Sequence, residues 1–235
     1  MFRSIASSLM MLAMTSIASA ATIVSYNLQG TTGDQAFQAP FVQAANTTGV
    51  NLTRGAGLLA SAAASSFSSS GFESAVQAPS SNEFLEFGFN IAPGYKVDVS
   101  ELYVGTRSSN TGPGTIGLYS SVDNFTTPIS TWGVIPATSF VNQVVSLSSL
   151  PDLTGNVRFR LYEVGNAQAN NNALATASTG TFRVTAYFVS GVFDRDFQIT
   201  GTVNAVPEAS SIFMVMIVMT VGVVAVRARR RVASV

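Results

Sequence analysis

Apolar and polar residues alternate over several stretches in the middle of the chain. The apolar positions of these stretches are Leu85, Phe87, Phe89 and Ile91; Tyr95, Val97 and Val99; Val157, Phe159 and Leu161; Phe182, Val184, Ala186 and Phe188; and Phe197, Ile199, Gly201 and Val203. Successive side chains of a strand point to opposite faces, so this period predicts strands with one buried and one wetted face. No helical period persists between them. The pattern predicts an all-β domain, an antiparallel β-sandwich of jelly-roll type.

Turn and loop residues separate these stretches. The sequence Ala92-Pro93-Gly94 predicts a turn, which would make 83–91 and 95–105 a hairpin or meander. Residues 56–82 are rich in Ser, Ala and Gly and are expected to form a flexible loop or an irregular strand region. Residues 168–179 contain three consecutive asparagines and are expected to form a second loop.

The first twenty residues have the three parts of a secretory signal peptide. Arg3 supplies the positive charge, residues 5–17 are uncharged and mostly apolar, and Ala18-Ser19-Ala20 is a small-x-small exit. We expect signal peptidase to cut between Ala20 and Ala21 after export through the Sec machinery. The alternative is a buried N-terminal helix, which would need neither the charge nor the cleavage site.

The other end of the chain has the features of a membrane span. Residues 209–226 contain no charged residue, and as a helix they would reach about 27 Å, close to the thickness of the hydrocarbon core. A cluster of arginines follows at once: Arg227, Arg229, Arg230 and Arg231. Such a cluster stays on the cytoplasmic side, which places everything before the span outside the cytoplasm. The alternative is an apolar core helix of the domain.

Charge and composition exclude several function classes. Between the two ends, residues 21–206 carry seven basic and eleven acidic residues, a net charge of −4. Nucleic-acid binding needs a basic face, so no nucleic-acid partner is expected. The chain has no cysteine and no histidine, which removes thiol catalysis, a Ser-His-Asp triad, thiolate or imidazole zinc sites and a lipoprotein-type anchor. We expect no cofactor and no enzymatic activity.

The sequence around the start of the apolar span resembles a known sorting signal. Val206, Pro207, Glu208 and Ala209 precede the span, within a motif at 206–211, and the arginines at 227–231 follow it. This order resembles the PEP-CTERM signal, although Ala209 stands where that motif usually has a second proline. The resemblance implies temporary retention in the inner membrane and processing by an exosortase, a membrane-embedded, transpeptidase-like cysteine protease. The alternative is a permanent C-terminal anchor, with Pro207 as a helix-start residue.

A second resemblance covers most of 22–203. The segments 51–58, 67–72, 87–100, 107–113 and 119–125 resemble the recurring ectodomain of PEP-CTERM proteins, which carries no established activity over to this chain. The expected organisation is a signal peptide at 1–20, an extracytoplasmic domain at 21–205 and a sorting tail at 206–235. We expect a non-catalytic structural protein of the cell surface or extracellular polymeric matrix. The alternative function is a carbohydrate-binding module for exopolysaccharide or environmental glycan.

A few polar and aromatic residues are candidates for a site. Pairs of carboxylates at Asp194 and Asp196, or at Asp98 and Glu101, are too sparse for calcium, which takes six to eight oxygen ligands. Glu83 and Glu86 are three residues apart on one strand and therefore point to opposite faces, unlike a glycosidase pair.

Four aromatic residues and two arginines each have more than one possible role. Aromatic side chains could stack on sugars or pack within the sheets; they are Trp132, Tyr103, Tyr162 and Tyr187. Arg54 and Arg107 could each pair with an acidic residue inside the sandwich or orient a loop, and the sequence does not choose between these roles.

Overall fold

The structure is a computed structural model that describes residues 20–73, 76–134, 140–170 and 173–207. Fifteen strands and one short 3₁₀ helix, η1 (Ser121–Asp123), form this part of the chain. All pairings between the strands are antiparallel. The predicted all-β fold is confirmed.

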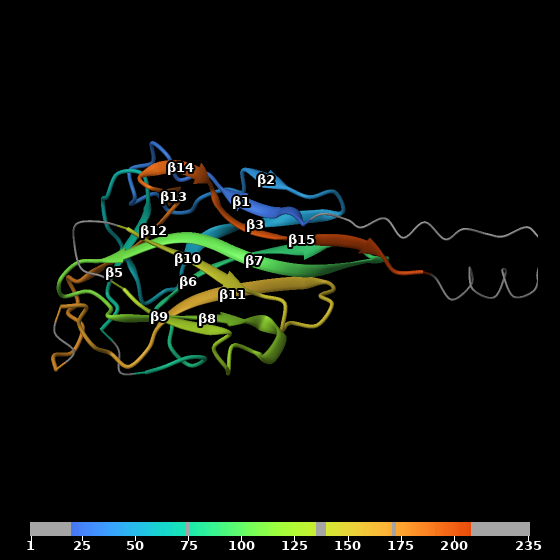
Figure 1. Cartoon of the computed structure of the whole chain (residues 1–235). Coiled ribbons are helices and arrows are strands. Elements are labelled where there is room, and N and C mark those ends of the chain that lie inside the picture. The colour runs from blue at the N-terminus through green and yellow to red at the C-terminus, as the bar shows by residue number, and fades with distance from the viewer. Residues whose placement is uncertain (1–19, 74–75, 135–139, 171–172, 208–235) are drawn as a thin grey trace, which may run out of the picture.

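The larger sheet is organised around one long strand. In spatial order its strands are β2 (Val42–Gln43), β1 (Ala21–Tyr26), β15 (Phe197–Ala205), β7 (Tyr95–Ser108), β12 (Thr181–Thr185), β5 (Phe67–Ser70) and β4 (Leu59–Ala60), and β10 (Val141–Ser146) also pairs with β7. The β10 register overlaps the registers of both β15 and β12 on β7. Therefore β15 and β12 share one edge of β7 in succession, and β10 occupies the other edge (Figure 1).

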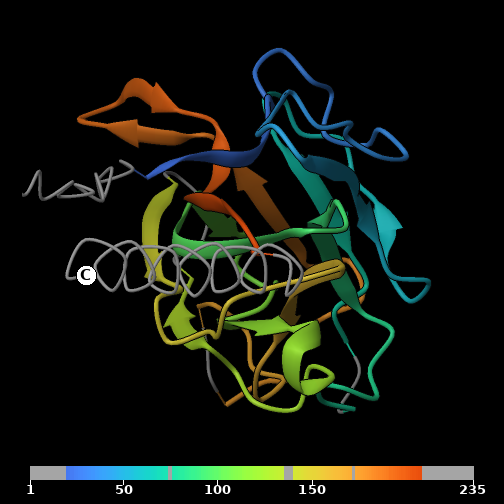
Figure 2. The ribbon, with the colours of Figure 1, turned by 90° about the vertical axis from the view of Figure 1, so that its right-hand side faces the viewer.

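The second sheet has five strands, and a small hairpin stands apart from both sheets. The sheet order is β3 (Thr47–Arg54), β6 (Phe84–Ile91), β11 (Asn156–Glu163), β8 (Thr115–Ser120) and β9 (Ser130–Gly133). The hairpin consists of β13 (Tyr187–Val189) and β14 (Val192–Arg195). It projects from the body of the molecule, as the orange strands in Figure 2 show.

Both sheets contribute side chains to a single core. Phe87 of β6 packs with its ring centroid 5.8 Å from that of Phe159 in its own sheet and 4.8 Å from that of Phe197 in the other sheet. The predicted inward positions of β6, β11 and β15 are buried or packed against this core. Phe182, Val184 and Ala186 are also buried, whereas Phe188 is half-buried because it belongs to the projecting hairpin.

The predicted hairpin between 83–91 and 95–105 is wrong. Strands β6 and β7 lie in different sheets, so the turn at 92–94 carries the chain from one sheet to the other. Alternation reports which face of a strand is buried, and two strands that bury their faces in one core alternate alike whether or not they pair.

The serine-rich stretch 56–82 is more than a loop. It contains β4 and β5, and the side chains of Phe67 and Phe72 within it are completely buried. No helix forms over 55–64, and residues 173–179 belong to no named strand.

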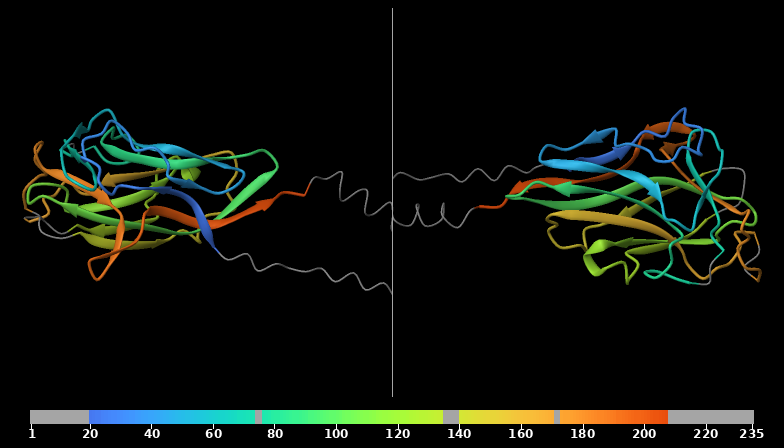
Figure 3. Two further views of the ribbon diagram at one scale, coloured as in Figure 1. Left: turned by 90° about the horizontal axis from the view of Figure 1, so that it is seen from above. Right: turned by 180° about the vertical axis from the view of Figure 1, so that it is seen from behind.

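Both ends of the domain emerge at the same end of the sheets. Ala21 at the start of β1 pairs with Gly201 of β15, and Ala205 at the end of β15 pairs with Tyr95 at the start of β7. The C-terminal end of β7 is about 43 Å away at the ordinary rise of a strand. Figure 3 shows β1 beginning where β15 ends, with loops gathered at the opposite end.

We expect Phe87→Ala to destabilise the domain by about 3–5 kcal/mol, because it removes a buried ring that both sheets contact. Urea denaturation followed by fluorescence measures the change. Val122→Ala is the control, because Val122 is 45% exposed and its loss should change stability by no more than about 0.5 kcal/mol. Equal effects of the two substitutions would contradict the core described above.

Candidate functional site

The structure describes some of the residues predicted to take part in processing. Ala20 and Ala21 are exposed at the start of β1, and Val206 and Pro207 are exposed after β15. The backbone N–H of Val206 donates to the carbonyl of Gly94 at 2.8 Å.

The remaining processing positions lie outside the described residues. These are Ala18, Glu208, Ala209, the span 209–226, and Arg227, Arg229, Arg230 and Arg231. Within the residues that are described, no helix is long and apolar enough to cross a bilayer.

Three of the four carboxylates considered for calcium are engaged with protein groups, and the fourth, Asp98, is exposed. Asp194 forms an ion pair with Arg195 at 2.5 Å, and Asp196 accepts a hydrogen bond from Ser25 at 3.4 Å. Glu101 accepts a hydrogen bond from the hydroxyl of Tyr103. In the described part of the chain, no three acidic side chains gather closely enough to hold a metal ion.

The four aromatic residues considered for sugar stacking do not form a common platform. Tyr162 is 1% exposed, and Trp132 packs partly on the core with its Nε1 donating to Thr106 Oγ1 at 3.2 Å. Tyr103 and Tyr187 meet edge to face at 90°, and the guanidinium of Arg195 lies 4.3 Å from the Tyr103 ring centroid. None of the four presents a free coplanar surface with another.

Arg54 orients a loop, one of the two roles that the sequence left open. Its guanidinium donates to the carbonyls of Gln35 at 2.6 Å, Gly33 at 2.8 Å and Ser68 at 2.7 Å, and it lies over the ring of Phe67 at 3.8 Å. Burial lowers the pKa of Arg54 to about 10, although the charge of Asp34 opposes this shift. Arg54 therefore ties β3, at the edge of the second sheet, to β5 of the first sheet and to the loop at 33–35.

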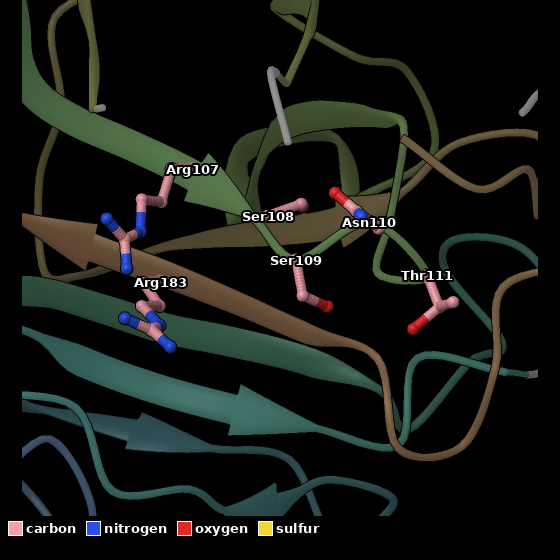
Figure 4. Close-up of a pocket in the computed structure, with 6 residues that line it drawn as sticks. All are labelled: Arg107, Ser108, Ser109, Asn110, Thr111 and Arg183. Atoms are coloured by element: carbon pink, nitrogen blue, oxygen red, sulfur yellow. The ribbon is translucent and has the colours of Figure 1, made fainter. Parts of the chain in front are cut away.

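Arg107 has a different environment, because a second arginine lies directly opposite it. Arg107 of β7 is in register with Arg183 of β12. The neighbouring positions Thr106, Ser108 and Phe182 are buried, so the two arginines, both half-buried, lie on the outer face of the larger sheet. Figure 4 shows both guanidinium groups on the same side of this ladder.

The two arginines line a hollow of about 380 Å³ at the C-terminal end of β7. The loop that follows β7 supplies the polar side chains of Ser109, Asn110 and Thr111 (Figure 4). Among the residues that the structure describes, no acidic side chain lines this hollow. Burial, and next the like charge of Arg107, lower the pKa of Arg183.

A second hollow has a volume of about 480 Å³. Its wall includes Phe140, whose ring centroid lies 4.9 Å from the guanidinium of Arg107, and Phe188 of the hairpin. The side-chain amide of Asn142 exchanges two hydrogen bonds with the backbone of Phe188 and so fixes the hairpin beside this hollow.

A buried carboxyl group supports the loop that holds the arginine hollow. Thr111 accepts a backbone hydrogen bond from Ala177 at 3.0 Å, and Thr176 donates its hydroxyl to the carboxyl of Glu163. Glu163 is 7% exposed. Burial raises the pKa of Glu163 to about 7, although the hydrogen bond from Thr176 opposes this shift.

Sequence reasoning missed Arg183 as a site residue. Alternation predicts that Arg183 lies on the wetted face of its strand, but the pairing with Arg107 joins residues 76 positions apart in the chain and depends on the order of the strands. No local pattern carries that information.

Comparison with known protein families, curated proteins and solved structures finds no significant match to the chain.

We expect the stability of the domain to fall as the pH rises from about 4.5 to about 7. Glu163 stays protonated in the folded domain over this range, whereas it ionises in the unfolded chain above its ordinary pKa of 4.5. At Glu163 the unfolded state then binds fewer protons than the native state, so the contribution of Glu163 to stability is full below about pH 4.5 and lowest above about pH 7. Glu163→Gln should remove this decrease.

Urea denaturation at pH 5 and pH 7.5 measures the effect. Glu73→Gln, at an exposed position, is the matched control and should keep the wild-type pH dependence. A Glu163→Gln variant that loses as much stability as the wild type between these pH values would contradict the assignment.

Proposed function

We propose that the protein is an exported, non-catalytic component of the cell surface or extracellular polymeric matrix. In this proposal residues 1–20 direct export, and residues 206–235 hold the precursor in the inner membrane until an exosortase-type protease releases it. The observation that carries the proposal is that the first and last strands of the domain, β1 and β15, begin and end at the same end of the sheets. The loops at the other end would then face away from the membrane.

The boundary between domain and tail supports processing of the folded protein. The hydrogen bond from Val206 to Gly94 is a backbone contact at the very end of the domain, and Pro207 beyond it is exposed. A proline holds the chain near it extended, as a protease cleft requires. The motif would therefore lie outside the folded domain, where a membrane-bound protease has access to it.

The strand order supports a β-sandwich of jelly-roll type. Two four-stranded layers can be followed through the sheets, β1-β15-β7-β10 and β6-β11-β8-β9. Two facing sheets of four strands are the arrangement of a jelly roll. The strands β2, β3, β4, β5 and β12 would then be additions to these layers.

The alternative function, a carbohydrate-binding module, has less support from the aromatic residues. Tyr103 and Tyr187 pack edge to face, Tyr162 is buried, and Trp132 packs partly on the core. The arginine-lined hollow is the observation that favours a binding role.

Replacement of both Pro207 and Glu208 by alanine should block release and leave full-length precursor in the inner membrane. The apolar span and the arginines are unchanged in this variant, so its topology should be kept. The measurement is the mass and location of the protein in a host with an exosortase and in one without. Substitution of Arg229, Arg230 and Arg231 by glutamine should act differently and release or mislocalise unprocessed protein.

A permanent anchor gives a different result. The Pro207 and Glu208 variant would then match the wild type in size and location in both hosts. A mature wild-type protein that retains Arg231 in both hosts would contradict the sorting proposal.

A further inference from the structure

The pair Arg107–Arg183 is unfavourable in the free domain. Like charges directly opposite one another on two antiparallel strands destabilise a sheet, because the side chains start about 5 Å apart. Every acidic residue of the chain except Glu208 lies in the described part, and none of these lines the hollow. A structural role would call for a carboxylate between the two guanidinium groups.

The other basic residues of the described domain are all satisfied by protein groups. Lys96 pairs with Asp152, Arg160 with Glu86 and Arg195 with Asp194, and Arg54 and Arg158 donate to backbone carbonyls. Within the described residues, Arg107 and Arg183 form no ion pair and donate no hydrogen bond to a protein atom. Both arginines line the hollow, and no described residue accepts a hydrogen bond from their guanidinium groups.

We propose that this hollow binds the anionic groups, carboxylate or sulfate ester, of an acidic polysaccharide. A guanidinium presents a planar fork of donors that matches the two oxygens of such a group. With an anion bound, the repulsion between Arg107 and Arg183 becomes attraction of both to the ligand. This inference concerns the domain itself and does not depend on how the tail is processed.

The surroundings of the arginines suit a sugar that carries the anionic group. Ser109, Asn110 and Thr111 offer short polar side chains at the mouth of the hollow, where sugar hydroxyls need donors and acceptors. The second hollow offers the apolar rings of Phe140 and Phe188. Arg107 of the first hollow contacts Phe140 of the second, so successive sugars of one chain could occupy both.

The charge of the domain favours a polysaccharide over a nucleic acid. A nucleic acid presents a dense row of phosphates and is bound by an extended basic surface. Here the basic side chains that lack both an ion pair and a hydrogen-bonded protein acceptor are, in the described domain, Arg107 and Arg183, and the domain has a net charge of −4. A polymer with one anionic group per sugar ring needs no more than such a local site.

The mature protein, purified from the host that exports it, allows a direct test. Binding is measured by calorimetry with polygalacturonate, which carries a carboxylate on each ring, and with its methyl ester, which keeps the backbone and loses the charge. Dextran sulfate and neutral dextran form the corresponding pair for sulfate esters. Duplex DNA serves as a competitor of a different class.

The variants Arg107→Gln and Arg183→Gln each remove one guanidinium at a half-buried surface position. Lys96→Gln is the matched control, because it removes one positive charge at the opposite end of β7. We expect each arginine variant to weaken binding of the charged polymer about tenfold or more, as for the loss of a charge-assisted hydrogen bond. The control should bind like the wild type, and the neutral polymers should not bind.

The two charged polymers distinguish the anionic groups. Tighter binding of polygalacturonate assigns a carboxylate, and tighter binding of dextran sulfate assigns a sulfate ester. Failure of the wild type to bind either polymer, equal losses in the arginine and Lys96 variants, or full displacement by DNA of equal charge would overturn the proposal. Fractionation of the same variants should show wild-type location, so loss of binding is separate from a failure of sorting.

Discussion

The arrangement of the domain depends on the hydrogen-bonded pairing of β7. This strand of fourteen residues is long enough for two strands to pair in succession along one edge, β15 near the chain ends and β12 near the loops. Its inner face contributes Val97, Val99, Leu102 and Val104 to the common core. The pairing with β15 places the start of β1 and the end of β15 at one end of the sheets, and the pairing with β12 places Arg183 opposite Arg107 at the other.

The arginines of the domain differ according to what faces them. Arg54 donates hydrogen bonds to backbone carbonyls and links the two sheets, so its side chain has a structural role. Arg160 pairs with Glu86 at 2.7 Å and lies between the rings of Phe84 and Phe125. Arg107 and Arg183 face one another, and in the described part of the chain neither has an acceptor. A charge that the protein does not neutralise is the physical basis for expecting an anionic ligand there.

The sequence predicts well which face of a strand is buried, but it predicts poorly which strands pair with one another. Alternation identifies the inward faces of β6, β11 and β15 because burial on one face is a local property of a strand. It fails for the hairpin expected at 92–94, since the choice of partner depends on strands distant in the chain. For the same reason the sequence leaves the roles of Arg54 and Arg107 open and does not single out Arg183 as a site residue. The sequence does not predict β5 as a regular strand, because the serines around Phe67 weaken its apolar pattern.

Arg107 and Arg183 should repel one another in the unliganded domain. A double-mutant cycle of Arg107→Gln and Arg183→Gln, with unfolding free energies measured by denaturant at low and high salt, tests this repulsion most directly. We predict an unfavourable coupling of a few tenths of a kcal/mol or more at low salt, which shrinks as salt screens the two charges. A coupling that is zero or favourable at low salt would contradict the account, since it would mean that protein groups already neutralise the pair.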